Sequence, residues 1–187
     1  LIAALLISKT MFGVGTGVIL MLAVFGRDVF GAGDLGIGIL YAARGTGALI
    51  GPFLARAIFG TDDRGIIRGI SVCVLAVTVS YALFPLSPTI WIAGIFVFLG
   101  HLGSGAQWML STYGLQRATP DAIRGRIFSF EFGLVTLTIA ASTIVAGILS
   151  ENVAPAAAVW VMVALIGIAG TAWTVFTWPL RKTAPEG

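Results

Sequence analysis

Charged side chains are missing from long parts of this 187-residue sequence. The 48 residues from Gly69 to Gln116 contain no Asp, Glu, Lys or Arg. As one straight helix this segment would be roughly 72 Å long, more than twice the ~30 Å hydrocarbon thickness of a lipid bilayer. Pro85 and Pro88 lie in its middle, and each proline lacks an amide donor and disfavours helix in the residue before it. The segment is therefore predicted to form two membrane-spanning helices joined by a tight turn.

Cysteine and histidine are almost absent, and this limits the chemistry of the chain. Cys73 cannot form an internal disulfide, and one His, one Cys and no carboxylate cluster do not make a zinc site. ATP binding is not expected, because no Gly-rich loop ending in Lys-Ser or Lys-Thr occurs. His101 and Ser104 suggest a serine hydrolase only weakly, since they share one helix and no nearby acid orients the histidine. We expect no enzyme, no metal and no cofactor.

Apolar residues, by contrast, are in excess. Hydrophobic residues make up 58% and charged residues 10% of the chain, and the mean hydropathy is +1.02, whereas a soluble domain carries about 25% charge. The composition predicts an integral membrane protein whose first partner is the lipid bilayer. The expected fold is all-α with six transmembrane helices. Their expected ranges are 1–26, 35–58, 66–84, 89–115, 127–149 and 157–179.

Basic residues gather on one side of this predicted bundle. Eight of the 11 Lys and Arg residues lie beside the second, fourth and sixth spans, whereas the turns on the other side hold only Arg27. The eight are Arg56, Arg64, Arg68, Arg117, Arg124, Arg126, Arg181 and Lys182. Cytoplasmic loops carry an excess of Lys and Arg, so both ends are expected in the cytoplasm. This bias accounts for the pI near 9.5 without a nucleic-acid partner.

The same loops carry a family resemblance. Residues 44–56 (RGTGALIGPFLAR), 60–69 (GTDDRGIIRG) and 115–130 (LQRATPDAIRGRIFSF) resemble the C-terminal half, helices seven to twelve, of a major facilitator superfamily transporter. More narrowly, the chain is similar to the bacterial efflux branch that includes siderophore and macrolide exporters. The Pro-Asp-x-x-Arg-Gly-Arg string at 120–126 is the most specific match. The Arg-Gly-x-Gly-x-x-x-Gly-Pro string at 44–52 is the next.

This resemblance implies a fold, a function and a partner. The fold would be one six-helix half-domain over residues 1–187, built as two inverted three-helix repeats. The function would be secondary, proton- or ion-coupled efflux of a small amphiphilic molecule by an antiporter of the bacterial inner membrane, through alternating access. The partner would be a missing N-terminal six-helix half, since Leu1 already lies in an apolar span. The alternative is a structural or assembly membrane protein with the same six spans.

Polar and ionisable residues inside the spans are candidates for a substrate cavity or for ion coupling, because charge at membrane depth is costly and normally faces a cavity or partner. The candidates are Lys9, Arg44, His101, Ser104, Gln107, Trp108, Ser111, Glu131 and Thr138. For Ser, Thr and Gln the alternative is hydrogen bonding between helices. Glu131 alternatively pairs with Arg124 or Arg126, and Lys9 alternatively extends to the cytoplasmic interface.

Arg44 and the fourth span make the most specific predictions among these candidates. Arg44 lies near mid-membrane, so its guanidinium is expected to face a hydrated cavity, toward a carboxylate of the missing half or an anionic group of the substrate. On the fourth span, His101, Ser104, Trp108 and Ser111 recur at three- and four-residue spacing. They therefore share one helix face, which is predicted to line the cavity.

Two cytoplasmic loops combine acids with arginines. Thr61 and Thr119 are predicted to cap the helices that follow, with an acid in the first turn of each. The residues expected to change charge partners during gating are Asp62, Asp63, Arg64, Arg68, Asp121, Arg124 and Arg126. The alternative is that they act only as caps and topology signals, with the arginines pairing with these acids or with anionic lipid headgroups.

Glycines at four-residue spacing predict close helix packing in two places. Gly13 and Gly17 share one helix face, as do Gly47 and Gly51, and small residues let helix backbones approach in lipid. Pro52 directly follows Gly51, which predicts a kink in the second span.

Overall fold

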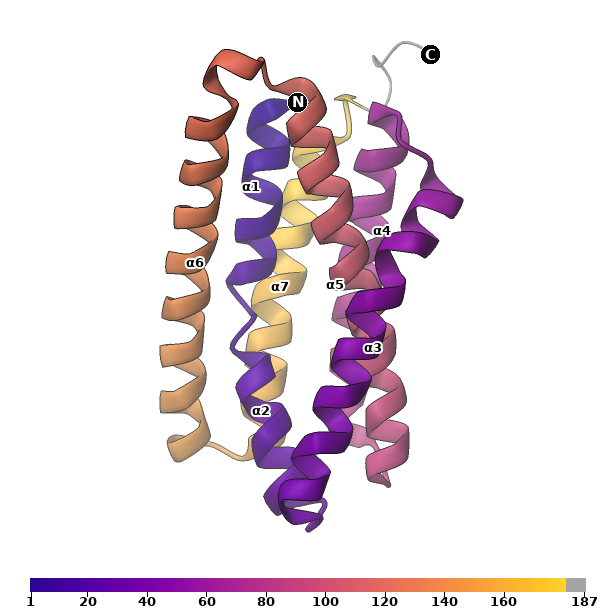
Figure 1. Cartoon of the computed structure of the whole chain (residues 1–187). Helices are drawn as coiled ribbons and strands as arrows, with labels where there is room; N and C mark the ends of the chain where they lie inside the picture. The colour runs from indigo at the N-terminus through magenta and orange to yellow at the C-terminus, as the bar shows by residue number, and fades with distance from the viewer. Residues whose placement is uncertain (181–187) are drawn as a thin grey trace.

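Six apolar helical segments lie side by side in the computed structural model, which describes residues 1–180 (Figure 1). Within those residues, the six segments are 23 to 32 residues long and apolar enough to cross a membrane. The predicted all-α membrane protein with six candidate spans is therefore confirmed at that level. The elements are α1 (Ile2–Gly13), α2 (Val18–Val24), the π-helical turn η1 (Phe25–Val29), α3 (Gly33–Phe59), α4 (Asp63–Leu83), the 3-10 turn η2 (Phe84–Leu86), α5 (Ile90–Ala118), α6 (Asp121–Asn152) and α7 (Pro155–Thr177).

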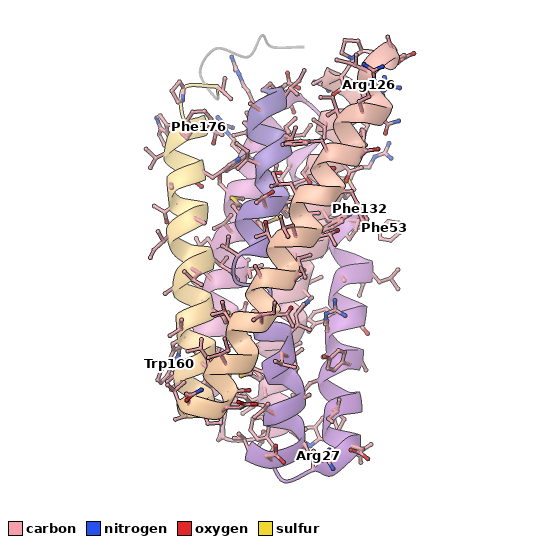
Figure 2. All side chains as sticks on the ribbon, turned by 90° about the vertical axis from the view of Figure 1, so that its left-hand side faces the viewer. Arg27, Phe53, Arg126, Phe132, Trp160 and Phe176 are labelled. Carbon is pink, nitrogen blue, oxygen red and sulfur yellow. The ribbon has the colours of Figure 1, made fainter. Side chains whose placement is uncertain are left out.

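The connections alternate between the two ends of the bundle. Leu1 and the loops after α3 and α5 lie at one end, and the turns after η1, η2 and α6 lie at the other (Figure 1). Arg126 and Arg27 accordingly mark opposite ends in Figure 2. The predicted turn between α4 and α5 is present: Pro85 lies in η2, and the Thr89 side chain caps α5 by accepting a hydrogen bond from Ile92 N at 3.4 Å. Arg181 and Lys182, which belong to the predicted basic side, lie outside the described residues.

The predicted threonine caps are wrong. Asp62, not Thr61, is the N-cap of α4, and its carboxylate accepts from Gly65 N at 3.2 Å. At α6 the N-cap is Pro120, and the buried Thr119 hydroxyl has no hydrogen-bond partner within residues 1–180. The reason is position: the cap must directly precede the first helical residue, and proline with φ −57° and ψ 144° itself forms the extended step into α6.

The first span is interrupted near its middle, which the sequence did not predict. α1 ends at Gly13 and α2 begins at Val18, and between them the backbone makes tighter bonds to the third residue back, such as Thr16 N to Gly13 O at 3.1 Å. The hydroxyl of Ser142 on α6 accepts from Gly17 N and donates to Val14 O, both at 2.9 Å. A side chain of another helix therefore satisfies backbone groups that lipid cannot.

Close packing at the predicted glycines is confirmed. A Cβ atom on Gly51 would lie 2.2 Å from Leu102 O, and one on Gly47 would lie 2.4 Å from Phe98 O, so α3 and α5 approach backbone to backbone. A Cβ atom on Gly17 would lie 2.4 Å from Ser142 O on α6. Pro52 lies inside α3, which changes direction toward its later end in Figure 1. These contacts set the position of the helices around the cavity described below.

α3 and α6 are the least covered spans. Only 17% of the most apolar 18-residue window is buried in each, against 56% in the first span. Phe53 on α3 and Phe132 on α6 are 73% and 64% exposed and project outward in Figure 2. Since such apolar surface is unfavourable in water, lipid or another protein must cover these two helices.

Candidate functional site

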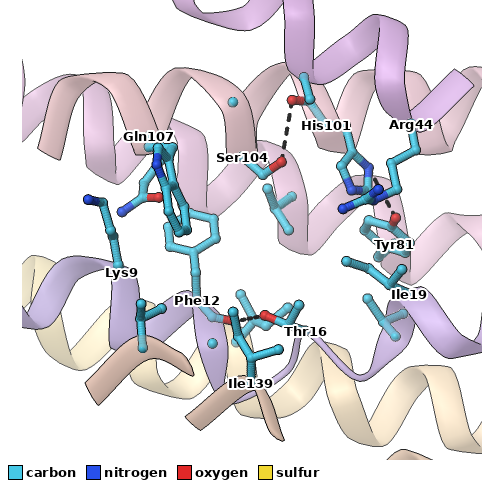
Figure 3. Close-up of a pocket in the computed structure, with 18 of the residues that line it drawn as sticks. Lys9, Phe12, Thr16, Ile19, Arg44, Tyr81, His101, Ser104, Gln107 and Ile139 are labelled. Atoms are coloured by element: carbon cyan, nitrogen blue, oxygen red, sulfur yellow. Dashed lines mark hydrogen bonds between the residues drawn. The ribbon is translucent and has the colours of Figure 1, made fainter. Parts of the chain in front are cut away.

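A cavity of about 580 Å³ lies between the helices, and all six spans contribute to its wall (Figure 3). Its volume falls in the range of about 300 to 1,000 Å³ that is usual for small-molecule sites. The wall is mainly apolar, with Phe12, Ile19, Val77 and Ile139 among its residues. Its polar and amphipathic members are Lys9, Thr16, Arg44, Tyr81, His101, Ser104, Gln107 and Trp108.

Lys9 on α1 forms a buried ion pair with Glu131 on α6. The Lys9 ammonium lies 3.0 Å from each carboxylate oxygen and donates a hydrogen bond to Oε2. Lys9 is 4% and Glu131 2% exposed, and the ammonium also lies 4.7 Å from the centroid of a Trp108 ring. Lys9 therefore does not extend to the interface, and Glu131 does not pair with Arg124 or Arg126. Burial of both charges is tolerated because each neutralises the other.

Arg44 on α3 is the second cation of the cavity, and its environment is different. Within residues 1–180 no carboxylate forms an ion pair with it, and its Nε atom is buried without a hydrogen-bond partner. The guanidinium carbon lies 5.9 Å from the centroid of the Tyr41 ring, one turn back on the same helix. This contact with an aromatic face offsets part of the cost of a charge at membrane depth.

Tyr81 and His101 lie beside Arg44 at the same end of the cavity (Figure 3). The Tyr81 hydroxyl lies 3.2 Å from His101 Nδ1, which also lies 3.1 Å from Val97 O. Nδ1 cannot accept from Tyr81 and donate to Val97 at once, so the histidine tautomer decides which contact is the hydrogen bond. Tyr81 was not among the predicted residues, although a hydroxyl that needs a partner inside an apolar span is a signal for it.

Four candidates on α5 lie on the cavity wall: His101, Ser104, Gln107 and Trp108. Gln107 also donates to Ser8 Oγ on α1 at 3.4 Å. Three other candidates, Glu131, Ser111 and Thr138, do not line the cavity. Ser111 is fully buried and donates to Trp108 O at 3.1 Å, and Thr138 donates to Leu134 O in its own helix at 2.8 Å. Thr16, whose hydroxyl donates to Phe12 O at 3.0 Å, lines the cavity without having been predicted.

The charged loops form contacts away from the cavity. Asp63 pairs with Arg117, which also donates to Thr61 O, so the loop before α4 is tied to the end of α5. Asp121 pairs with Arg124, which donates to Thr119 O at 3.1 Å. Asp62 is occupied as a cap. Of the remaining gating candidates, Arg64 is half-buried, and Arg68 and Arg126 are exposed.

Comparison with known proteins identifies no family for this arrangement of helices. Six long apolar helices around a shared cavity indicate the broad class of protein to which the chain belongs. The chain is a polytopic membrane protein. No family model, no curated protein and no solved structure matches it.

Proposed function

We propose that the chain is a six-helix half of a secondary active transporter of the major facilitator type, which exports a small amphiphilic molecule. The observation that carries the proposal is the cavity, which has the volume of a small-molecule site and takes part of its wall from every span. A cavity between helices with ionisable residues at membrane depth is typical of a transport pathway. A purely structural bundle gains little from keeping Arg44 in an apolar span, since no carboxylate pairs with it within residues 1–180.

The arrangement of the spans supports a second half. α3 and α6 leave most of their apolar surface uncovered, and both contribute to the cavity wall, through Arg44 on α3 and Ile139 on α6. A partner packed on these two helices would close the cavity from the side. We therefore place the other half against α3 and α6, and infer alternating access from rocking of the two halves about the cavity.

The buried ion pair supplies a candidate for proton coupling. Proton transfer to Glu131 would remove its negative charge and leave the Lys9 ammonium without a counter-ion in a dry site. The two helices that carry the pair, α1 and α6, would then lose their main polar contact. We also propose the orientation: the excess of Arg in the loops after α3 and α5 supports a cytoplasmic location for that end of the bundle, in the inner membrane of a bacterial cell.

The experiment is transport in inverted membrane vesicles that contain the full-length protein. A respiration-driven proton gradient is followed with acridine orange, and candidate amphiphiles are added in turn. Release of the gradient by one of them supports the proposal if it is lost in Glu131→Gln at a temperature where dye labelling of Cys73 shows this variant to be folded, and kept in the control Thr143→Val on the exposed side of α6. If the folded protein transports no amphiphile and exchanges no protons, the structural or assembly alternative stands instead.

A further inference from the structure

The charges of the cavity do not balance, and the imbalance lies at one end. Lys9 and Arg44 are the charged side chains on its wall, and within residues 1–180 no Asp or Glu lines it. Glu131, which does not line the cavity, neutralises Lys9: its Oε1 lies 3.0 Å from the Lys9 ammonium nitrogen. The charges of Lys9, Glu131 and Arg44 therefore sum to +1, and the excess belongs to Arg44.

Arg44 is also the cation that still has hydrogen bonds to donate. Its Nε is buried and has no partner within residues 1–180. The guanidinium is a planar fork that matches a carboxylate through two parallel hydrogen bonds. Tyr81, with its hydroxyl, and His101 lie beside it (Figure 3). One end of the cavity thus has the donors for an anionic group and no acceptor of opposite charge.

The rest of the wall suits an apolar body. Figure 3 shows Arg44 with Tyr81, His101 and Ile19 at one end and Lys9 with Gln107 at the other, with Phe12 and Ile139 between them. A ligand with an anionic head at Arg44 would lay its body along this apolar stretch. The Lys9 end adds no net charge, because its ion pair is already complete.

We propose that Arg44 is the anion subsite of the cavity and that the substrate is an amphiphilic carboxylate with a single negative charge. This assignment rests on the proposed transport function and adds the class of substrate to it. A monoanion brings the charge of the site to zero, whereas a dianionic phosphate would leave one negative charge and an amine would place two cations in an apolar cavity. The carboxylate also fits the bidentate geometry of the guanidinium.

The test compares three probes with one body and different heads: 4-phenylbutanoate, 4-phenylbutanamide and 4-phenylbutan-1-amine. The full-length protein is held in lipid nanodiscs, and binding of radiolabelled 4-phenylbutanoate is measured by scintillation proximity, with the other two as competitors. We expect the carboxylate to bind about tenfold more tightly than the amide or better, since a charge-assisted pair replaces a neutral contact. The amine is expected to bind most weakly.

Variants then connect the preference to Arg44. Arg44→Gln should reduce carboxylate affinity to the level of the amide and leave amide binding unchanged, and Arg44→Lys should lose part of the preference because it keeps the charge without the fork. Arg56→Gln, an exposed arginine on the same helix outside the cavity, is the matched control. If Arg44→Gln is not monodisperse on gel filtration, the test depends on Arg44→Lys: a partial loss of the carboxylate preference supports the subsite, and an unchanged preference overturns it.

Three outcomes overturn the subsite. The first is equal or tighter binding of the amine or amide, and the second is a carboxylate preference that survives Arg44→Gln. The third is binding of no probe, which is expected if a carboxylate of another half neutralises Arg44. The proposed function can fail separately from the subsite. Carboxylate binding that depends on Arg44, without transport in vesicles, supports the subsite and overturns the transporter. Transport of an amine that does not depend on Arg44 supports the transporter and overturns the subsite.

Discussion

Lys9 and Arg44 are two cations on one cavity wall, yet the fold treats them in opposite ways. Lys9 is almost fully buried, and α6 supplies Glu131 as its counter-ion. Arg44 is half-buried, its guanidinium carbon lies 5.9 Å from the centroid of the Tyr41 ring, and no described carboxylate of α6 pairs with it. The first charge thus helps to hold the helices together, whereas the second has no counter-ion within residues 1–180.

The comparison separates a structural role from a binding role. Removing one member of a buried ion pair leaves an uncompensated charge, which is strongly destabilising. Removing a cation that has no counter-ion abolishes its weaker contacts but also abolishes the cost of desolvating it, so the two effects on stability partly cancel. Stability measurements should therefore distinguish the two residues before any substrate is known.

The largest expected effect is that of Glu131→Gln. The variant leaves the Lys9 ammonium buried without a counter-ion, which costs about 3 to 5 kcal/mol. Unfolding is followed with a thiol-reactive fluorogenic dye, because Cys73 is the single cysteine and is buried. The dye should label Cys73 at a clearly lower temperature than in the wild type.

Two further variants complete this comparison. The double variant Lys9→Met with Glu131→Gln should recover most of the stability, because a similar-sized apolar side chain replaces the orphaned charge. Arg44→Gln should change stability by about 1 kcal/mol or less. Equal destabilisation by Glu131→Gln and Arg44→Gln would mean that Arg44 is as structural as Lys9, and the distinction would be lost.

A medium effect is expected where α3 carries Arg44 past α5. In Gly51→Ala the new Cβ atom would meet Leu102 O at 2.2 Å, so the two backbones must separate, at a cost of about 1 to 3 kcal/mol. Gly38→Ala is the matched control on the same helix, because no atom lies within 4 Å of its Cβ position.

The backbone shift in Gly51→Ala should affect the position of Arg44 and not that of Lys9. Gly51→Ala should weaken the Arg44-dependent binding of 4-phenylbutanoate in nanodiscs, while the dye-labelling temperature falls by far less than in Glu131→Gln. Should Gly38→Ala weaken binding equally, the close approach of α3 to α5 would not be what positions Arg44.

The smallest effect is expected at the exposed ion pair between Asp63 and Arg117. Their side chains are 32% and 44% exposed, and ion pairs in water contribute about 0 to 1 kcal/mol. Asp63→Asn should therefore leave the dye-labelling temperature nearly unchanged. A loss as large as that of Glu131→Gln would show that burial is not what makes the Lys9 pair important.

Much of the fold was predictable from sequence because lipid restricts the choices. Charge-free runs of spanning length must be helical in a bilayer, and Pro85 with Pro88 divides the longest of them. The spacing of Gly47 and Gly51 predicted close packing on that face of the second span, and the structure identifies α5 as the neighbour. These signals are local, since each can be read from one continuous stretch of the chain.

The features that the sequence did not reveal depend on distant partners. Glu131 lies 122 residues from Lys9, and Ser142 lies 125 residues from Gly17, so neither partner is marked by spacing. The caps failed for a different reason: Asp62 and Thr61 are both competent caps, and the choice depends on where the helix begins. The candidate cavity residues were polar or ionisable apart from Trp108, which excluded Phe12 by type; Tyr81 carries a hydroxyl and was overlooked although its type qualified.

The interruption of the first span has a consequence for hydrogen exchange. Gly17 N–H donates to the Ser142 hydroxyl at 2.9 Å instead of to a carbonyl of its own helix. Protection of this amide from solvent deuterium therefore depends on α6 remaining packed against the first span, whereas amides inside α6 are protected by their own helix. Exchange at Gly17 thus reports the separation of two helices, and would register an opening of the bundle that leaves every helix intact.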